Sequence, residues 1–409
     1  MAVGDVLVGL DIGFSDLNLV VARVNDFNQL DILCNSSCPC KSFDKDFKIK
    51  RENIKKELAT ILKKVENKYK LNIGSCYVTV PGIYVDVQPK ENVVTINNPI
   101  KGVTDEDIIK AIEDARKTSP KASYTDIEIV PYKYILDNGK YVNNAIGRHT
   151  NSLVMLSQII YAKNEYIDDI FDIFEELDLL VDDFVPVALG QKELLADDKN
   201  KNSVMIIDFN KEDIEISIFI KDAFVYTDTL KFGTNMISKI IAYNLKIDEE
   251  EAENLIKKYP LALKSYIDTD NNILLKTSKE LEYNKRTIKT THLVGIIEET
   301  IIKIFEKINK DISNVGYKKF VDKIILTGDI INISQTDVLA TTIFNKKVRP
   351  ELKEKYLMEK EKYFRSYSIL KYISKEKEVE LEYSSLVDQK EQKNLLKKIL
   401  ESIKDFFYS

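Results

Sequence analysis

Two stretches of the sequence share one pattern, in which an apolar strand, a short loop and a second apolar strand follow one another. The first pairs residues 6–12 (VLVGLDI) with 18–24 (NLVVARV), and the second pairs 203–208 (SVMIID) with 214–220 (IEISIFI). Runs of β-branched and other apolar residues on both sides of a short loop predict β-hairpins. A hairpin near the start of each half indicates an internal duplication, and therefore a protein with two related lobes.

Helical patterns fill much of the remaining sequence. Apolar residues recur at helical spacing in 51–69, 164–178 and 291–314, and 234–265 is expected to be helical too. Thr104 precedes three acidic residues and is a predicted helix N-cap. Strands that alternate with helices in both halves predict a mixed α/β architecture. The other strand patterns lie at 76–82, 124–136, 152–162, 224–230 and 320–329.

The charge of the chain excludes some classes of partner. Sixty basic and 66 acidic residues give a net charge of -6, which offers no general attraction to nucleic acid. No window approaches 18 consecutive apolar residues, and the start lacks a signal core, so we expect a cytosolic protein. Cys34, Cys38, Cys40 and Cys76 do not have the spacing of a zinc site or a disulfide framework, so reduced, structural thiols are expected.

The first hairpin carries candidate chemistry in its loop. Asp11 lies at the end of a strand, Gly13 permits a tight backbone, and Ser15 offers a hydroxyl. A carboxylate at a strand end can position a metal-bound water, while the N–H groups of the loop can face phosphate oxygens. An ordinary hairpin turn is the alternative interpretation, because D-x-G-x-S is a short and frequent pattern.

The second half lacks the glycines that a phosphate clamp needs. Asp208 occupies the matching strand end, but the loop 209–213 reads FNKED, and its side chains would hold the backbone away from a phosphate. Its two carboxylates would repel the anion, and Lys211 offsets this only in part. The loop after the strand IILT keeps one glycine, Gly328, where an adenosine pocket needs close approach of the backbone. A simple strand-to-helix turn is the alternative interpretation of this glycine. Glycine is scarce throughout, with 13 residues where average usage of roughly 7% predicts about 29.

No rival catalytic constellation is present in the sequence. His149 and His292 are the only histidines, and neither has a cysteine, serine or second histidine placed to suggest a triad or a metal site. The sequence contains no G-x-S-x-G, H-E-x-x-H or G-x-x-x-x-G-K-[ST] motif. Packing or surface roles are therefore expected for both histidines.

Residues 374–409 combine a charged, poorly periodic stretch with a short amphipathic pattern. Residues 374–394 are charged and poorly periodic, as in a solvated linker. Residues 395–409 form an amphipathic helix pattern that predicts an in-plane membrane anchor, which buries its apolar face and sets lysines near anionic headgroups. A helix that docks on the body or on a partner protein is the alternative. The predicted membrane-binding residues are Leu395, Leu396, Lys397, Lys398, Ile399, Leu400, Ile403, Lys404, Phe406 and Phe407.

The order of these features resembles the FtsA family of bacterial division proteins, within the actin-like superfamily. The resemblance covers nearly the whole chain, and residues 86–161 are its most specific part because they resemble the inserted subdomain of that family. The segments that carry it are VGLDIGFS, CYVTVPG, GVTDEDIIKAIEDARK, VPYKYILDNGKYVNNAIGRHTNSLVM, ELDLLVDDFVPVALG, LKFGTNMISKIIAYNLKIDEEEAENLIKKY, LTGD and the terminal helix.

The resemblance implies an α/β, actin-like two-lobed fold with duplicated RNase H-like cores, an FtsA-type inserted subdomain and a C-terminal amphipathic helix. The implied boundaries are 1–85 and 162–200 for subdomain 1A, 86–161 for subdomain 1C, 201–235 and 320–373 for subdomain 2A, 236–319 for subdomain 2B, 374–394 for a flexible linker and 395–409 for the membrane-targeting helix.

The resemblance also implies a function. Such a protein binds ATP with Mg²⁺ between its lobes, self-associates into filaments and links the tubulin-like FtsZ ring to the inner face of the cytoplasmic membrane. Asp11 and Asp208 would then be the metal ligands. The implied cofactor-binding residues are Asp11, Gly13, Ser15, Asp208, Lys211, Gly233, Glu253, Lys257 and Gly328.

Several positions depart from the family pattern. The second phosphate loop is FNKED, the lysine expected after the first motif is replaced around Asp16 and Leu17, and one glycine stands in the adenosine loop. Thr300 lies where the family places an arginine that meets the FtsZ C-terminal tail. We therefore expect a membrane-tethered division adaptor in which ATP binding is weakened or lost, with no turnover or at most a weak ATPase activity.

Two other functions remain open. A sugar or acetate kinase of the same superfamily needs an acceptor-site base beside a glycine-rich phosphate loop, and no such pair is found in this chain. A pilus-assembly adaptor related to FtsA would share the hairpins, but neither the inserted subdomain nor the terminal helix.

Overall fold

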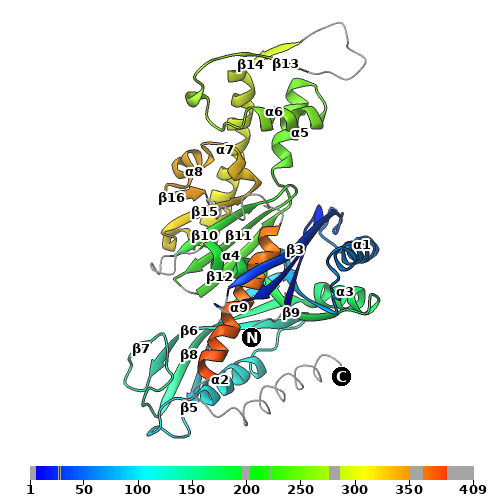
Figure 1. Cartoon of the computed structure of the whole chain (residues 1–409). Coiled ribbons are helices and arrows are strands. Elements are labelled where there is room, and N and C mark those ends of the chain that lie inside the picture. The colour runs from blue at the N-terminus through cyan, green and yellow to red at the C-terminus, as the bar shows by residue number, and fades with distance from the viewer. Residues whose placement is uncertain are drawn as a thin grey trace.

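The computed structural model of the chain describes residues 6–25, 27, 29–195, 203–221, 223–275, 286–350 and 363–384, the last nine by their backbone alone. Two lobes are stacked end to end, each built on a five-stranded sheet, and a third, four-stranded sheet projects from the first lobe (Figure 1). The actin-like α/β fold that the sequence predicts is confirmed.

The first lobe contains the N-terminal hairpin at the centre of its sheet. Its strands lie in the order β3-β2-β1-β4-β9, antiparallel across the first three and parallel from β1 to β9. Helices α1 (Arg51–Tyr69) and α3 (Asn164–Glu175) cover one face with their apolar sides. The strands are β1 (Val6–Ile12), β2 (Asp16–Val24), β3 (Leu30–Pro39), β4 (Ser75–Val80) and β9 (Leu180–Pro186).

The second lobe repeats this topology. Its sheet has the order β12-β11-β10-β15-β16, again with an antiparallel hairpin pair beside parallel strands, which confirms the predicted duplication. The strands are β10 (Val204–Phe209), β11 (Ile214–Ile220), β12 (Ala223–Leu230), β15 (Lys323–Gly328) and β16 (Lys347–Pro350). The helices are α5 (Asn235–Leu245), α6 (Glu249–Lys258), α7 (Thr290–Val315) and α8 (Thr336–Phe344), and β13 (Asn272–Leu274) pairs with β14 (Thr287–Lys289).

The helical region expected at 234–265 contains two helices, α5 and α6. The expected segment 234–265 breaks between α5 and α6, where Lys246 adopts a left-handed conformation with a φ of 51°. Asp248 is extended, with a φ of -71° and a ψ of 152°, and α6 begins after it. A left-handed residue followed two positions later by an extended one ends a helix whatever the hydrophobic pattern on either side.

The inserted subdomain packs one helix on its own sheet. The strand order is β5-β8-β6-β7, and α2 (Asp105–Lys117) packs Ala111 and Ala115 against it. The predicted cap at Thr104 is confirmed as a capping box with Asp107, whose side chain accepts from the Thr104 backbone N–H. The strands are β5 (Val85–Thr95), β6 (Tyr124–Leu136), β7 (Tyr141–Val142) and β8 (Ser152–Lys163).

Two helices lie where the lobes meet, α4 (Val187–Leu195) and α9 (Phe364–Ser384) (Figure 1). The apolar side of α9 covers the face of the first sheet that α1 and α3 leave open, because Ile369, Leu370 and Ile373 pack with Leu7 and Val20. The approach is close: a Cβ added to Gly9 would lie 2.4 Å from the Ser366 carbonyl oxygen.

The position of α9 corrects two expectations. Residues up to 373 were expected to belong to subdomain 2A, but α9 packs on the sheet of the first lobe. Residues 374–384 were expected to begin a linker, and they continue α9 instead. Lysine and glutamate are good helix formers, so a charged and poorly periodic run can still extend a helix whose first turns are buried. The predicted membrane-binding residues, 395–407, lie outside the described residues.

Close packing of α4 on α9 gives a testable expectation at Gly190. A Cβ at this position would lie 2.6 Å from the Ser368 hydroxyl oxygen and 2.7 Å from the Ile369 backbone nitrogen. Because a helix backbone cannot yield like a flexible side chain, Gly190→Ala is expected to lower the free energy of unfolding by about 1–3 kcal/mol in urea denaturation. Gly74→Ala is the control, since nothing lies within 4 Å of its Cβ, and an equal loss in both variants would contradict this packing.

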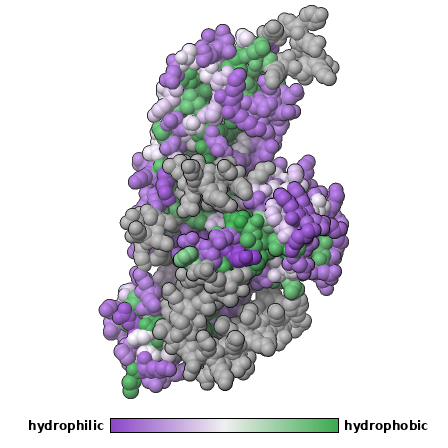
Figure 2. Space-filling model, viewed as in Figure 1, coloured by the Kyte–Doolittle hydropathy of each residue, from purple (hydrophilic) through white to green (hydrophobic). Residues whose placement is uncertain are grey.

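The outer surface of the described residues is largely hydrophilic in the view of Figure 2, with smaller hydrophobic areas between. Within the described ranges, no helix combines the length and the apolar content needed to cross a bilayer. The four cysteines are free thiols, as predicted.

Candidate functional site

The alternation of side chains along two strands brings carboxylates to the junction of the lobes. In β1, Val8, Leu10 and Ile12 face the core under α1, so Asp11 points to the opposite face, which α9 covers. In β10, Met205, Ile207 and Phe209 pack in the second lobe's own core, so Asp208 points outward toward the first lobe. Asp11 and Asp208 are both buried, at 3% exposure each.

Arg365, at the start of α9, reaches this place. Its Nε donates to Oδ2 of Asp208 at 2.8 Å, and its Nη2 lies 2.7 Å from the same oxygen. Nη2 also lies 3.3 Å from Oε2 of Glu215 and 3.7 Å from Oδ2 of Asp213. Gln191 of α4 donates its amide to the same Asp208 oxygen at 2.8 Å. We call Asp11, Asp208, Asp213, Glu215 and Arg365 the interlobe cluster.

The cluster holds four buried carboxyl groups and one guanidinium. Burial raises the pKa of Asp213 to about 7 and that of Glu215 to about 8, although the Arg365 charge opposes both shifts. Burial raises the pKa of Asp11 as well, against the same guanidinium. Burial by itself lowers the pKa of Arg365, but the surrounding carboxylates outweigh it and keep that pKa raised. Arg365 is therefore a permanent cation in this site.

The lobes touch beside the cluster. The short turn η1 (Gly82–Tyr84) of the first lobe packs against β11 and β12 of the second. A Cβ on Gly82 would lie 2.4 Å from Oγ1 of Thr227 and 3.3 Å from Oε1 of Glu215. Both carboxylate oxygens of Glu215 lack a hydrogen-bond partner, as does Oγ1 of Thr229. Polar groups of β11 and β12 thus face the first lobe directly.

The loop of the first hairpin turns a carboxylate toward its own glycine. The Gly13 N–H donates to the Asp16 carbonyl at 2.9 Å, and a Cβ on Gly13 would lie 2.9 Å from Oδ1 of Asp16. The backbone carbonyl of Ser15 accepts from the Cys40 N–H. A phosphate that approached Gly13 would meet the Asp16 carboxylate, and like charges repel.

The loop of the second hairpin is closed by the backbone. The Asn210 N–H donates to the Asp213 carbonyl at 2.9 Å, and the carbonyl of Asn210 accepts from the Thr234 N–H. A Cβ on Gly233 would lie 2.3 Å from the Asn210 carbonyl oxygen, so Gly233 lies directly against this loop. Nζ of Lys211 pairs with Oε1 of Glu253 at 3.0 Å.

Gly328 ends β15 beside the cluster. Its φ is 77°, and an added Cβ would lie 2.2 Å from the Phe209 carbonyl oxygen and 2.8 Å from Oδ1 of Asp208. Close packing on β10 therefore requires glycine here. Of the predicted cofactor-binding set, Asp11, Asp208 and Gly328 lie at the junction, Lys211 and Glu253 pair with each other, and Lys257 is exposed on α6.

A metal-bound nucleotide does not fit this arrangement. The Asp208 oxygen that would ligate Mg²⁺ already accepts from Arg365 and Gln191. In the part of the chain that the structure describes, no three His, Cys, Asp or Glu side chains are arranged to hold a metal ion together. A divalent ion beside a fixed guanidinium would be repelled, so it could bind Asp208 only after Arg365 leaves. The assignment of Asp11 and Asp208 as metal ligands stays a prediction.

The sequence interpretation did not place Gln191, Glu215 or Arg365 at the site, and it treated Asp213 only as a loop carboxylate that would repel an anion. One signal was visible, because Glu215 is a single carboxylate within the apolar strand IEISIFI. Arg365 carries no such signal, since 157 positions separate it from Asp208. Only the packing of α9 on the first sheet brings the two together.

Thr300 faces the interior of the second lobe. It lies on α7 at 4% exposure, and its hydroxyl donates to the Ile296 carbonyl at 2.7 Å. A partner cannot contact the Thr300 side chain in this conformation.

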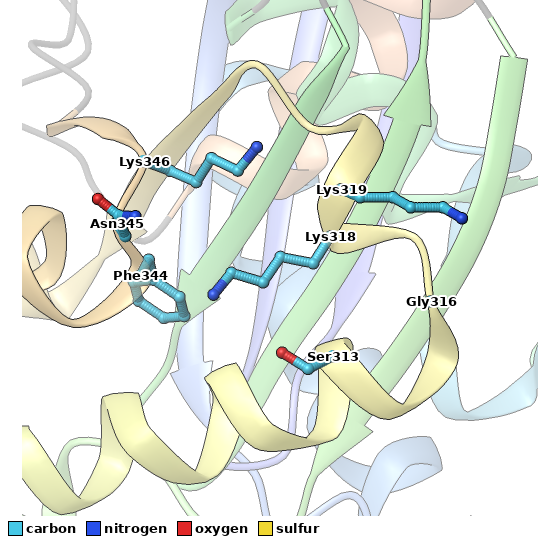
Figure 3. A pocket seen from close by; sticks show the side chains of 7 residues that line it. All are labelled: Ser313, Gly316, Lys318, Lys319, Phe344, Asn345 and Lys346. Atoms are coloured by element: carbon cyan, nitrogen blue, oxygen red, sulfur yellow. The ribbon is translucent and has the colours of Figure 1, made fainter.

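A cavity of about 380 Å³ lies elsewhere on the second lobe (Figure 3). It lies near the starts of β15 and β16, whereas Asp208 and Gly328 lie at the carboxyl ends of β10 and β15. Helices α7 and α8 both end here, and lysines stabilise helix C-termini by opposing the helix dipole. The lining residues are Ser313, Gly316, Lys318, Lys319, Phe344, Asn345 and Lys346.

Comparison with known families gives two matches. The profile described as "Cell division protein FtsA" matches residues 205–407, and the one described as "SHS2 domain inserted in FTSA" matches residues 82–161. The cell division protein FtsA of Escherichia coli K12 is 22% identical over 354 residues, which cover 84% of this chain and 83% of that protein. The FtsA of Borreliella burgdorferi is 25% identical and covers 79% of each chain.

Solved structures are similar in fold. The "PilM-PilN type IV pilus biogenesis complex" superposes with a TM-score of 0.57 at 11% identity, covering 90% of this chain and 97% of that one. A diol dehydratase-reactivating factor in nucleotide-free form gives a TM-score of 0.50 at 10% identity, with 90% and 100% covered. At such identities the likeness concerns the fold alone.

Proposed function

The chain belongs to the FtsA family of cell division proteins, and from this premise we propose that it is an adaptor that links the FtsZ ring to the inner face of the cell membrane. It works by binding, with little or no ATP turnover. The protein is bacterial and cytoplasmic in this proposal, and peripheral on the membrane at the division site.

The observation that carries the proposal is the combination of the two profile matches on one chain. The insertion at 82–161 accompanies a match that runs to residue 407, through the whole apolar face of the predicted anchor. That face offers two phenylalanines with leucines and isoleucines, each worth roughly 1.5–3 kcal/mol when fully buried. Anionic lipid is the proposed surface, since residues 390–409 carry five lysines and three acids.

A flotation assay with vesicles that contain phosphatidylglycerol tests the membrane tether. The full chain is expected to float with the vesicles, and a chain that ends at Asn394 is expected to stay in solution. Ile399→Asp, which places a charge on the apolar face, should release most of the protein, whereas Ser402→Ala should not. Equal flotation of the full and shortened chains would contradict the tether.

The proposed protein partners are FtsZ, through its C-terminal tail, and further copies of this chain. Because Thr300 is buried, contact with the tail must use other residues of the second lobe. Co-sedimentation with FtsZ polymers tests the first interaction, and electron microscopy of the purified chain on lipid monolayers tests filament formation. Absence of this chain from the pellet of FtsZ polymers would contradict the role of FtsZ as its partner.

Nucleotide binding is proposed to be weak or lost. If ATP with Mg²⁺ binds, Asp11, Gly13 and Ser15 would form the first phosphate motif, and Asp208 and Lys211 the second. Gly233, Glu253, Lys257 and Gly328 would then lie on the side of the nucleoside. Arg365 would have to move away from Asp208 first, because it already contacts the carboxylate that the metal needs.

Two alternatives differ in what they would bind or do. A pilus-assembly adaptor shares the fold, and the PilM likeness supports nothing beyond that. Retention of a pilus protein in place of FtsZ in a pull-down would favour it. A sugar or acetate kinase would transfer phosphate to a small acceptor in a coupled assay.

A further inference from the structure

We propose that Arg365 is an internal cation that holds the two lobes closed, in the place where a metal-bound ligand would otherwise supply the positive charge. Closure of the lobes is then a property of the chain itself. This inference goes beyond the adaptor role and does not depend on which partner the protein binds.

The backbone of Arg365 is fixed to the first lobe. Ile369, Leu370 and Ile373, one and two turns further along α9, are each at most 3% exposed in the core that α9 forms with the first sheet. Ser366 lies against Gly9 of β1, at a distance that leaves no room for a Cβ. The start of α9 therefore cannot shift without opening this core.

The guanidinium of Arg365 is bonded to the second lobe. Asp208, Asp213 and Glu215 all belong to the second hairpin, and the side chains of Arg365 and Asp208 are 8% and 4% exposed. At such burial, water and salt screen the attraction little. One side chain thus connects a helix packed on the first lobe to the hairpin of the second.

The cluster needs a positive charge. In the described part of the chain, Arg365 is the one cation paired with Asp208, Asp213 or Glu215. Without it, carboxyl groups from both lobes would face each other at low dielectric and repel whenever two of them are ionised. The same guanidinium also interacts with Asp11 of the first lobe. Arg365 therefore turns a repulsive junction into an attractive one.

The lobes also meet directly, through groups of the chain itself. Gly82 of the first lobe lies against Thr227 and Glu215 of the second, so the lobes are in contact beside the cluster. Since Arg365 and Gln191 already contact the Asp208 oxygen that a metal would need, the strength of this contact should be the same whether or not a nucleotide is added.

Hydrogen exchange on the full chain tests the proposal at the backbone amides of η1 and β12, which meet across the junction. In EDTA without nucleotide, these amides of the native chain are expected to be as protected as with Mg²⁺ and ATP. Arg365→Met should lower their protection at least tenfold while α1 and α7 stay protected, and Arg365→Lys, which keeps a charge, should lie between. Lys375→Met is the matched control on the same helix, because it removes a partly exposed ion pair with Glu193.

Two results would overturn the proposal. One is native protection at η1 and β12 that rises with Mg²⁺ and ATP, which would show that a ligand closes the lobes. The other is full protection of these amides in Arg365→Met. If Arg365→Met loses protection in every element, the variant has unfolded, and the native chain alone decides. Equal protection of η1 and β12 with and without Mg²⁺ and ATP then supports the proposal, and higher protection with Mg²⁺ and ATP contradicts it.

Discussion

Arg365→Met is expected to lower the free energy of unfolding by about 3–5 kcal/mol, the usual effect of removing one partner from a buried ion pair. Methionine fills similar volume, so the loss reports charge more than packing. Asp208 keeps its amide bond from Gln191 but loses the guanidinium, and Glu215 loses its nearest cation. Urea denaturation followed by circular dichroism measures the change.

Two further variants separate charge from helix packing. Arg365→Lys keeps a positive charge without the planar guanidinium that pairs with three carboxylates, and should lose less stability than Arg365→Met. Lys375→Met lies on the same helix and pairs with Glu193 at a partly exposed position, so its loss should stay within about 1 kcal/mol. A methionine variant as stable as the native chain would contradict the central role of the cluster.

The stability of the chain is expected to fall as the pH rises from about 4.5 to about 8, through protons held by Glu215 and Asp213. Burial raises the pKa of Glu215 to about 8 and that of Asp213 to about 7, whereas in the unfolded chain both titrate near 4. Between these values the folded chain binds more protons than the unfolded one, so this stabilisation is lost as pH rises. Each proton contributes at most about 1.4 kcal/mol per pH unit.

Glu215→Gln isolates this effect. Glutamine resembles the protonated acid in shape and cannot ionise, so the variant should match the native chain near pH 5 and exceed its stability near pH 8. Asp11, Asp208, Asp213 and Arg365 face Glu215 in both proteins, and their contributions largely cancel in the comparison. Urea midpoints at the two pH values supply the measurement. A difference between the proteins that does not change with pH would contradict a protonated Glu215.

Much of the fold could be predicted because it follows from local patterns. The two hairpins, the helix at 51–69 and the cap at Thr104 each depend on residues close in sequence. The extent of α9 could not be predicted in this way, because its charged second half resembles a linker, while its first half is buried by the distant strands of the first lobe.

The candidate site was predicted in part for the same reason. Asp11 and Asp208 lie at the ends of matching strands in the two hairpins, so their common position at the junction of the lobes follows from the duplication. Arg365 belongs to a segment with no motif, and its role arises only from tertiary packing against Gly9 and Gly190. Although glycine is scarce in this chain, glycine stands at positions 233 and 328, where a Cβ would clash with the backbone of the neighbouring loop or strand.

The most direct test of this account is titration of the full chain with a fluorescent ATP analogue, with and without magnesium. Because Arg365 holds the carboxylate that the metal would need, and Asp16 lies beside the first phosphate loop, we expect no saturable binding that depends on magnesium. Tight, magnesium-dependent binding to the native chain would contradict the claim that its own guanidinium, and not a bound nucleotide, joins the two lobes.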